Sequence, residues 1–212
     1  MGINLQKGQK IDLTKGGAGG AGMSRVLVGL GWDEAQIGGG GLFGSRNQND
    51  EIDCDASVIL LGANGKLYGN PENSDDYLVF FNNLRHYSGA IQHMGDNLTG
   101  GSMGGGQTDS EQITVDLNRV PPDVFKLVFV VNIYDGTAKG QHFGMIRNAY
   151  IRLSDMTTRN EICRFNLSEN YYGMTGMVVG EIYRYNGNWK FNAIGQPIKE
   201  ASRLISLVKL YI

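Results

Sequence analysis

The chain has 212 residues, of which 41% are hydrophobic and 19% are charged. This composition is too apolar for a disordered protein and fits one folded domain, so a single domain over residues 1–212 is expected. The net charge of −2, with lysine and arginine scattered, provides no basic field for nucleic acid, and no apolar run is long enough to cross a bilayer. The first 13 residues lack the apolar region of a secretion signal, which favours a cytoplasmic location.

The chain is expected to begin with β structure. Ile3 and Leu5, then Ile11 and Leu13, flank a turn at 7–10 and predict two short strands joined in a hairpin. Alternating or continuous apolar residues predict further strands at 25–31, 53–61, 77–81, 112–117, 126–133, 150–155, 161–166, 177–186 and 189–194. The dipeptide Asn64-Gly65 is the clearest turn signal among them.

Turns rich in glycine, asparagine and aspartate separate these strands, and helix is scarce. Leu204, Val208 and Tyr211 share one stripe of a predicted helix over 199–211. The pattern predicts an all-β protein, a two-sheet antiparallel β-sandwich with a short C-terminal helix. Cys54 and Cys163 lie in apolar strand segments, so two buried reduced thiols are expected in preference to a disulfide.

Two acids stand close together where a polar loop enters the strand at 53–61. Side chains alternate along a strand, so Asp53, Asp55 and Ser57 share one face. The two carboxylates repel each other, and either solvation or a bound divalent cation could relieve the repulsion. This segment alone leaves both explanations open.

A second acidic stretch runs from Asp96 and Asn97 through glycines to Asp109 and Glu111. Glycine permits tight backbone paths, and calcium prefers six to eight oxygen ligands, so this loop could form the wall of an ion site. A polar connection between strands without an ion is the alternative. The loop does not match an EF-hand, because it lacks that motif's spaced aspartates and final glutamate.

Seven segments in order along the chain resemble the TerD family of tellurite-resistance and stress proteins. They are residues 5–15, 26–33, 53–57, 60–66, 95–100, 141–150 and 180–184. The resemblance implies a β-sandwich that binds one or two Ca²⁺ ions through loop acids. It makes Asp53, Asp55, Asp96, Asp109 and Glu111 the main ligand candidates, with Asp33 and Asn97 as second choices.

The chain departs from the family pattern at two places. Thr108 or Ser110 stands where family members carry a further loop acid, and residues 38–48, which include no acid, expand an earlier loop. Both differences imply weaker calcium binding, or one ion in place of two.

The sequence predicts a protein that is not an enzyme. His86, His93 and His142 are far apart and lack metal-ligand spacing, and the glycine runs lack the lysine of a phosphate loop.

The leading hypothesis is a calcium-binding protein of the tellurite-resistance or stress-response type, whose ion-ordered loops bind other proteins such as TerD-family paralogues. The alternative is a structural component of a bacteriophage or another large assembly. Magnesium-dependent phosphoryl chemistry or acid–base catalysis by the paired carboxylates is the least favoured hypothesis.

Overall fold

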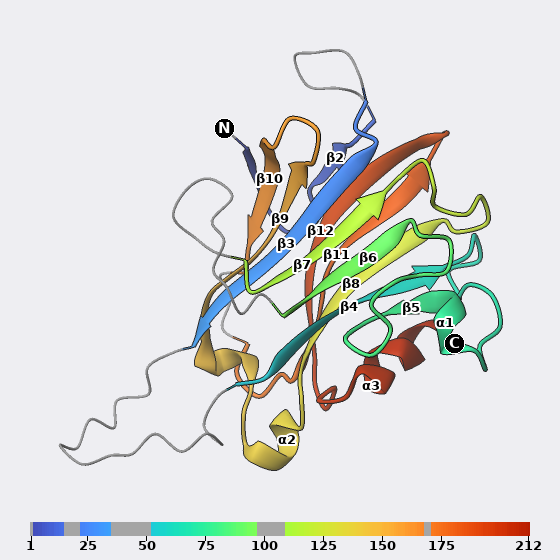
Figure 1. Ribbon diagram of the computed structural model, residues 1–212. Helices are drawn as coiled ribbons and strands as arrows, with labels where there is room; N and C mark the ends of the chain where they lie inside the picture. Colours follow the sequence, from blue (N-terminus) through green and yellow to red (C-terminus); the bar gives the residue numbers. More distant parts are fainter. Residues whose placement is uncertain (1, 15–21, 35–51, 97–108, 168–170) are drawn as a thin grey trace.

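The computed structural model describes residues 2–14, 22–34, 52–96, 109–167 and 171–212. Strands dominate these segments (Figure 1). They are β1 (Ile3–Leu5), β2 (Lys10–Asp12), β3 (Arg25–Glu34), β4 (Cys54–Leu61), β5 (Leu78–Val79), β6 (Ile91–Asp96), β7 (Glu111–Asp116), β8 (Lys126–Ile133), β9 (Ile146–Asp155), β10 (Glu161–Asn166), β11 (Gly176–Tyr185) and β12 (Asn188–Ile198). The helical elements are short: α1 (Ser74–Tyr77), α2 (Gly136–Lys139), η2 (Phe143–Met145), α3 (Leu204–Val208) and η3 (Lys209–Tyr211).

The strands form two six-stranded sheets. Sheet A has the order β1-β10-β9-β3-β7-β6, and sheet B has the order β2-β12-β11-β8-β4-β5. All pairs are antiparallel except β1 with β10. The predicted all-β fold with two antiparallel-dominated sheets and a short C-terminal helix is confirmed.

The first two strands do not form the predicted hairpin. β1 pairs with β10 in sheet A, whereas β2 pairs with β12 in sheet B. Between them, the Gly8 amide, at a positive φ of 80°, donates to the Ala193 carbonyl at 2.7 Å. The turn therefore carries the chain from one sheet to the other.

The core lies between the inner faces of the sheets. Phe129 and Phe191 are among its largest fully buried side chains. Cys54 and Cys163 are buried free thiols, as predicted, and burial raises the pKa of Cys163 to about 12. The inward face of β7 carries Glu111 before Ile113 and Val115, so an acid occupies an otherwise apolar row.

Three further elements differ from the sequence prediction. The segment expected as a strand at 77–81 contains the end of α1 and only two strand residues. Strand β6 was not predicted, because its inward residues are Ile91 and the polar His93. The C-terminal helix is also shorter than expected, since 199–203 run as a turn and irregular chain before α3 begins.

Strand pairing brings several acid-bearing segments to one end of the sandwich. β3 and β7 pair with Leu30 opposite Glu111, and β6 and β7 pair with Asp96 opposite Glu111. Strand β4 begins at the same end, where the Glu111 carboxylate accepts a hydrogen bond from the Ala56 amide. The acidic end is the end of the sandwich at which β3 and β6 end and β4 and β7 begin (Figure 1). Asp33 and Asp96 lie in the last two residues of β3 and β6, Asp53 directly precedes β4, and Glu111 begins β7.

In the part of the chain that the structure describes, no helix is both long and apolar enough to pass through a bilayer.

His86, in the connection between β5 and β6, predicts a pH dependence of stability. Its side chain is buried, with Nε2 3.0 Å from the Asp76 carbonyl and Nδ1 2.7 Å from the Ser88 hydroxyl. Burial lowers the pKa of His86 below its ordinary value of 6.5. Below that pH the unfolded chain binds a proton that folded His86 does not, so the free energy of unfolding falls on acidification, by at most about 1.4 kcal/mol per pH unit.

Thermal melts between pH 7.5 and pH 5 should therefore show a smaller loss of Tm for His86→Gln than for the unsubstituted protein. His142→Gln, which changes a half-buried histidine on another element, is the matched control. Equal pH profiles for all three proteins would contradict the prediction.

Candidate functional site

Two buried acids mark the start of β7, and they face opposite sides of sheet A. Asp109 lies two residues before the first residue of the strand and has an exposed fraction of 3%, and Glu111 begins the strand with an exposed fraction of 4%. Carboxylates are rarely buried to this extent without a partner. The contacts of each acid therefore define what the site can do.

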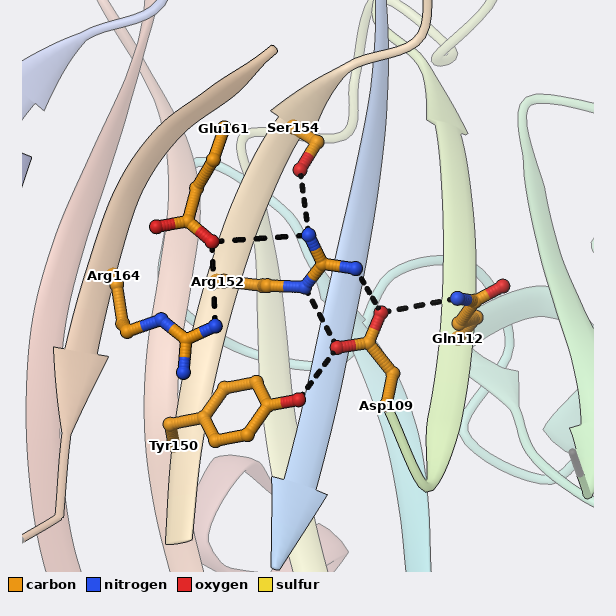
Figure 2. A network of polar contacts seen from close by, with 7 residues as sticks. All are labelled: Asp109, Gln112, Tyr150, Arg152, Ser154, Glu161 and Arg164. Carbon is orange, nitrogen blue, oxygen red and sulfur yellow. Dashed lines mark hydrogen bonds and ion pairs between the residues drawn. The ribbon is translucent and has the colours of Figure 1, made fainter. Parts of the chain in front are cut away.

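Asp109 lies in a dense network on the outer face of sheet A (Figure 2). The Arg152 guanidinium on β9 binds it in a fork, with Nε 2.7 Å from Oδ1 and Nη2 2.7 Å from Oδ2. The Tyr150 hydroxyl donates to Oδ1 at 2.9 Å and the Gln112 amide donates to Oδ2 at 3.0 Å. Such bidentate, charge-assisted contacts are strong and fix the carboxylate in one orientation.

Glycines on β3 make room for this network. A Cβ atom at Gly29 would come within 2.3 Å of Asp109 Oδ2, and one at Gly31 would come within 2.4 Å of the Tyr150 ring. Both glycines alternate with the inward-facing Leu30, so they lie on the outer face beneath the acid and the ring. Glycine is thus required at both positions, because the Asp109 carboxylate and the Tyr150 ring lie where a Cβ atom would be.

The network extends across β9 to β10. Arg152 Nη1 lies 3.7 Å from Glu161 Oε2, and Arg164 Nη2 lies 3.3 Å from the same oxygen (Figure 2). The Arg164 guanidinium also stacks over the Tyr150 ring at 4.0 Å. Hydrogen bonds to Asp109 raise the pKa of Arg152, while burial and then the Asp109 charge raise the pKa of Tyr150.

Glu111 faces the interior and connects the two sheets. Its Oε2 accepts a hydrogen bond of 2.7 Å from the Ala56 amide on β4. His93 Nδ1 accepts from the Gly95 amide at 3.0 Å, so its Nε2 is the donor toward the Ala56 carbonyl at 3.2 Å and Glu111 Oε2 at 3.3 Å. The start of β7 is therefore fastened to β9 through Asp109 and to β4 through Glu111.

The other described candidate ligands have different surroundings. Asp33 Oδ2 accepts from the Asn148 side chain at 2.8 Å, and Asp53 is exposed with its carbonyl bonded to the Tyr134 amide. Asp55 is half buried on the outer face of sheet B. The Asp96 backbone ends β6, and its side chain and Asn97 lie outside the described residues.

The described acids do not by themselves fit a calcium ion. Calcium takes six to eight oxygen ligands, yet the oxygens of Asp109 and Glu111 already accept hydrogen bonds from protein donors. Among the described residues, no three His, Cys, Asp or Glu side chains come together as a possible metal site. Calcium binding therefore stays a prediction.

Sequence reasoning missed the partners of Asp109. Arg152 and Tyr150 are more than 40 positions away from it, and the register between β9 and β3 brings them together. The outward alternation of Tyr150, Arg152 and Ser154 was a signal, since an arginine in the middle of a sheet needs a buried or bridging acid.

The protein is a two-sheet β-sandwich in which the buried acids Asp109 and Glu111 connect the start of β7 to neighbouring strands. The family model described as "TerD domain" matches residues 1–211. The chain belongs to the TerD domain family, which is the family of tellurium-resistance and stress-response proteins that the sequence resembles.

Relatives and solved structures agree with this assignment. The chain is 46% identical to "Stress response protein SCP2" of Bacillus subtilis (strain 168), with 100% of both chains covered. It is 39% identical to "Tellurium resistance protein TerD" of Serratia marcescens, over 92% of this chain and 91% of that protein. The crystal structure of a homologue of telluride resistance protein (TerD) from Streptomyces coelicolor A3(2) superimposes with a TM-score of 0.58 at 20% identity, covering 88% of this chain and 96% of that one, which supports the fold.

Proposed function

We propose that this member of the TerD family is a non-catalytic, calcium-binding protein whose acidic end holds the ion and presents a surface to partner proteins. The observation that supports this most directly is the pairing of Asp96 with Glu111, because it brings both ends of the connection between β6 and β7 to the acidic end. Cytoplasmic action beside other proteins of the same family is part of the proposal.

Two anchors support a site at this place. The Asp109–Arg152 fork and the Glu111–Ala56 bond fix the start of β7 against both sheets. Ligands on a fixed frame lose little freedom when they bind an ion, which raises affinity. The anchors therefore act as supports for the site, and they need not be ligands themselves.

The proposed ligands are the predicted residues other than Asp109, whose oxygens bind Arg152, and Glu111, which accepts from the Ala56 amide. Asp53 is exposed at the start of β4, and Asp96 and Asn97 lead from β6 into the following connection. Asp33, at the end of β3, is a further candidate although it accepts one bond from Asn148. Carboxylate, amide and backbone oxygens are the ligands that calcium prefers.

Calcium should raise the stability of the protein. Binding at a hundredfold excess over Kd contributes about 2.7 kcal/mol, which corresponds to a rise in Tm of about 5 to 10 °C for a domain of this size. Melts with calcium and with EDTA would measure it, beside calorimetric titration with magnesium as the competing ion. Identical melts and no heat of binding would rule out the proposal.

Two asparagine variants test where the calcium ion binds. Asp96→Asn and Asp53→Asn, which change carboxylates without a described arginine partner, are expected to weaken calcium binding while leaving the Tm in EDTA unchanged. Asp123→Asn is the matched control, because Asp123 is exposed before β8 begins, at the opposite end of that strand from the acidic end. Calcium-dependent cross-linking to family paralogues, lost in Asp96→Asn, would support the partner surface.

A further inference from the structure

Two arginine side chains meet above Gly89, in the connection between β5 and β6. A Cβ atom on Gly89 would lie 2.8 Å from Arg119 Nη2 and 3.1 Å from Arg85 Nη2. The two guanidinium groups are therefore at most about twice that distance apart at these nitrogens, although the residues are far apart in the sequence. Neither the relatives' names nor the proposed calcium site accounts for this pair.

The arginine pair lies at the opposite end of sheet A from the acidic end. β7 begins at the acidic end, and Arg119 follows the last residue of that strand, Asp116. β6 ends at the acidic end, and Gly89 lies two residues before the first residue of that strand. A ligand of the arginine pair would therefore bind away from the proposed calcium site.

Several hydrogen bonds hold the turn beneath the pair. The Gly89 amide donates to the His86 carbonyl at 2.8 Å, and the Ala90 amide donates to the Ser88 hydroxyl at 3.1 Å. The His86 ring is buried and contacts polar atoms through both of its nitrogens. Arg119 Nη2 donates to the Ser88 carbonyl at 3.2 Å, which fixes one of the two guanidiniums. Groups held in place in this way lose little freedom when a ligand binds.

The two positive charges are not balanced by an acid. Among the described residues, no carboxylate oxygen comes within ion-pair distance of the Arg85 or the Arg119 guanidinium. Asp116 is the nearest acid to Arg119 along the chain, and its Oδ1 accepts from the Asn118 amide at 3.1 Å. Like charges this close repel each other, and an anion bound between them relieves the repulsion.

The number of charges favours a phosphate monoester as the anion. Elsewhere in this protein one guanidinium is enough for one carboxylate, as the fork between Arg152 and Asp109 shows. Two guanidiniums match a ligand with two negative charges and several oxygens. A phosphate monoester carries a charge of about −1.5 to −2 at pH 7 and three strong acceptor oxygens, whereas each phosphate of a nucleic acid carries a single charge.

The surroundings of the pair favour a phosphate that is attached to a peptide. Both arginines are exposed, so the group can reach them without any opening of the fold. Leu84 is 44% exposed and Tyr87 is 65% exposed, and these two residues flank Arg85 in the chain. They offer apolar surface to the neighbours of a phosphorylated residue, and a free phosphate ion has no use for such surface.

We propose that Arg85 and Arg119 bind a phosphate monoester on a partner protein, the chemistry of a phosphorylated serine, threonine or tyrosine. Both guanidiniums donate charge-assisted hydrogen bonds to the phosphate oxygens, and Gly89 leaves room for them to approach each other. This surface is separate from the acidic end and does not depend on calcium.

The probe is a blocked pentapeptide with phosphoserine between two valines, titrated into the full chain and followed by amide chemical shifts in NMR spectra. The buffer contains EDTA, so the result is independent of the proposed calcium binding. We expect shifts at residues 84–90 and 117–120 with the phosphopeptide, none with the same peptide carrying serine, and weaker binding of inorganic phosphate. Arg85→Gln and Arg119→Gln should each raise the Kd by about 10- to 100-fold, as the loss of charge-assisted hydrogen bonds does.

Arg203→Gln is the matched control, because Arg203 is equally an exposed arginine but already donates to Asp135 at 2.8 Å. This variant should bind the phosphopeptide normally. Thermal melts in phosphate-free buffer give a second measurement, in which Arg85→Gln should leave the Tm unchanged. Absence of shifts, equal shifts with the serine peptide, equal affinity for inorganic phosphate, normal binding by Arg85→Gln, or a lower Tm of that variant would each overturn the proposal.

Discussion

Replacing Arg152 by methionine should lower the free energy of unfolding by about 3 to 5 kcal/mol, the usual cost of leaving one member of a buried ion pair without its partner. Asp109 keeps an exposed fraction of only 3% beneath Tyr150 and beside β3, so water cannot easily replace the guanidinium. Methionine preserves much of the side-chain length, so little of the expected loss of stability would come from an empty cavity. Urea unfolding followed by tryptophan fluorescence gives the change in free energy.

Removing both charges tests whether the loss comes from the unpaired acid. Asp109→Asn combined with Arg152→Met should recover most of the stability, because a neutral amide is much cheaper to bury than a carboxylate. Arg164→Met is the control, since that guanidinium contacts the partly exposed Glu161 and should cost about 1 kcal/mol or less. A double variant as unstable as Arg152→Met would mean that packing, and not the charge, carries the effect.

Most strands could be predicted because each sheet buries one face. The inward row Val26, Val28 and Leu30 on β3 alternates with Leu27 and with Gly29 and Gly31, and nearly all residues of β4 and β8 are buried. The error at the first two strands has a physical cause. A turn between two short amphipathic strands looks the same locally whether the strands pair with each other or with partners about 160 and 180 positions away.

The candidate site could be predicted only in part for a related reason. Asp109 and Glu111 were selected as ligands, but their observed contacts are Arg152 and the Ala56 amide, and such contacts depend on register between distant strands. The local sequence pattern does indicate on which face of the strand Glu111 lies. Its spacing to Ile113 places it on the inward face of β7, where a carboxylate must find a donor inside the protein.

Truncating Glu111 to alanine should lower the free energy of unfolding by about 2 to 4 kcal/mol, because it leaves the buried Ala56 amide without an acceptor. His93 Nε2, 3.3 Å from the same carboxylate oxygen, would lose that acceptor and keep the Ala56 carbonyl at 3.2 Å. Glu111→Gln retains an acceptor oxygen and should cost about 1 kcal/mol, the difference between a charged and a neutral hydrogen bond. Urea titrations of both variants measure the two losses.

The same variants separate a structural acid from a calcium ligand. If Glu111 acts by joining β7 to β4, the loss in Glu111→Ala is equal in EDTA and in calcium, because its partners are the Ala56 amide and His93. If Glu111 binds the ion, the loss grows with calcium concentration, since only the unsubstituted protein gains the binding free energy. The observed contacts favour the first result. If calcium binds at the proposed ligands, the Asp53→Asn and Asp96→Asn variants should show the opposite behaviour, with a loss of stability that grows with calcium concentration.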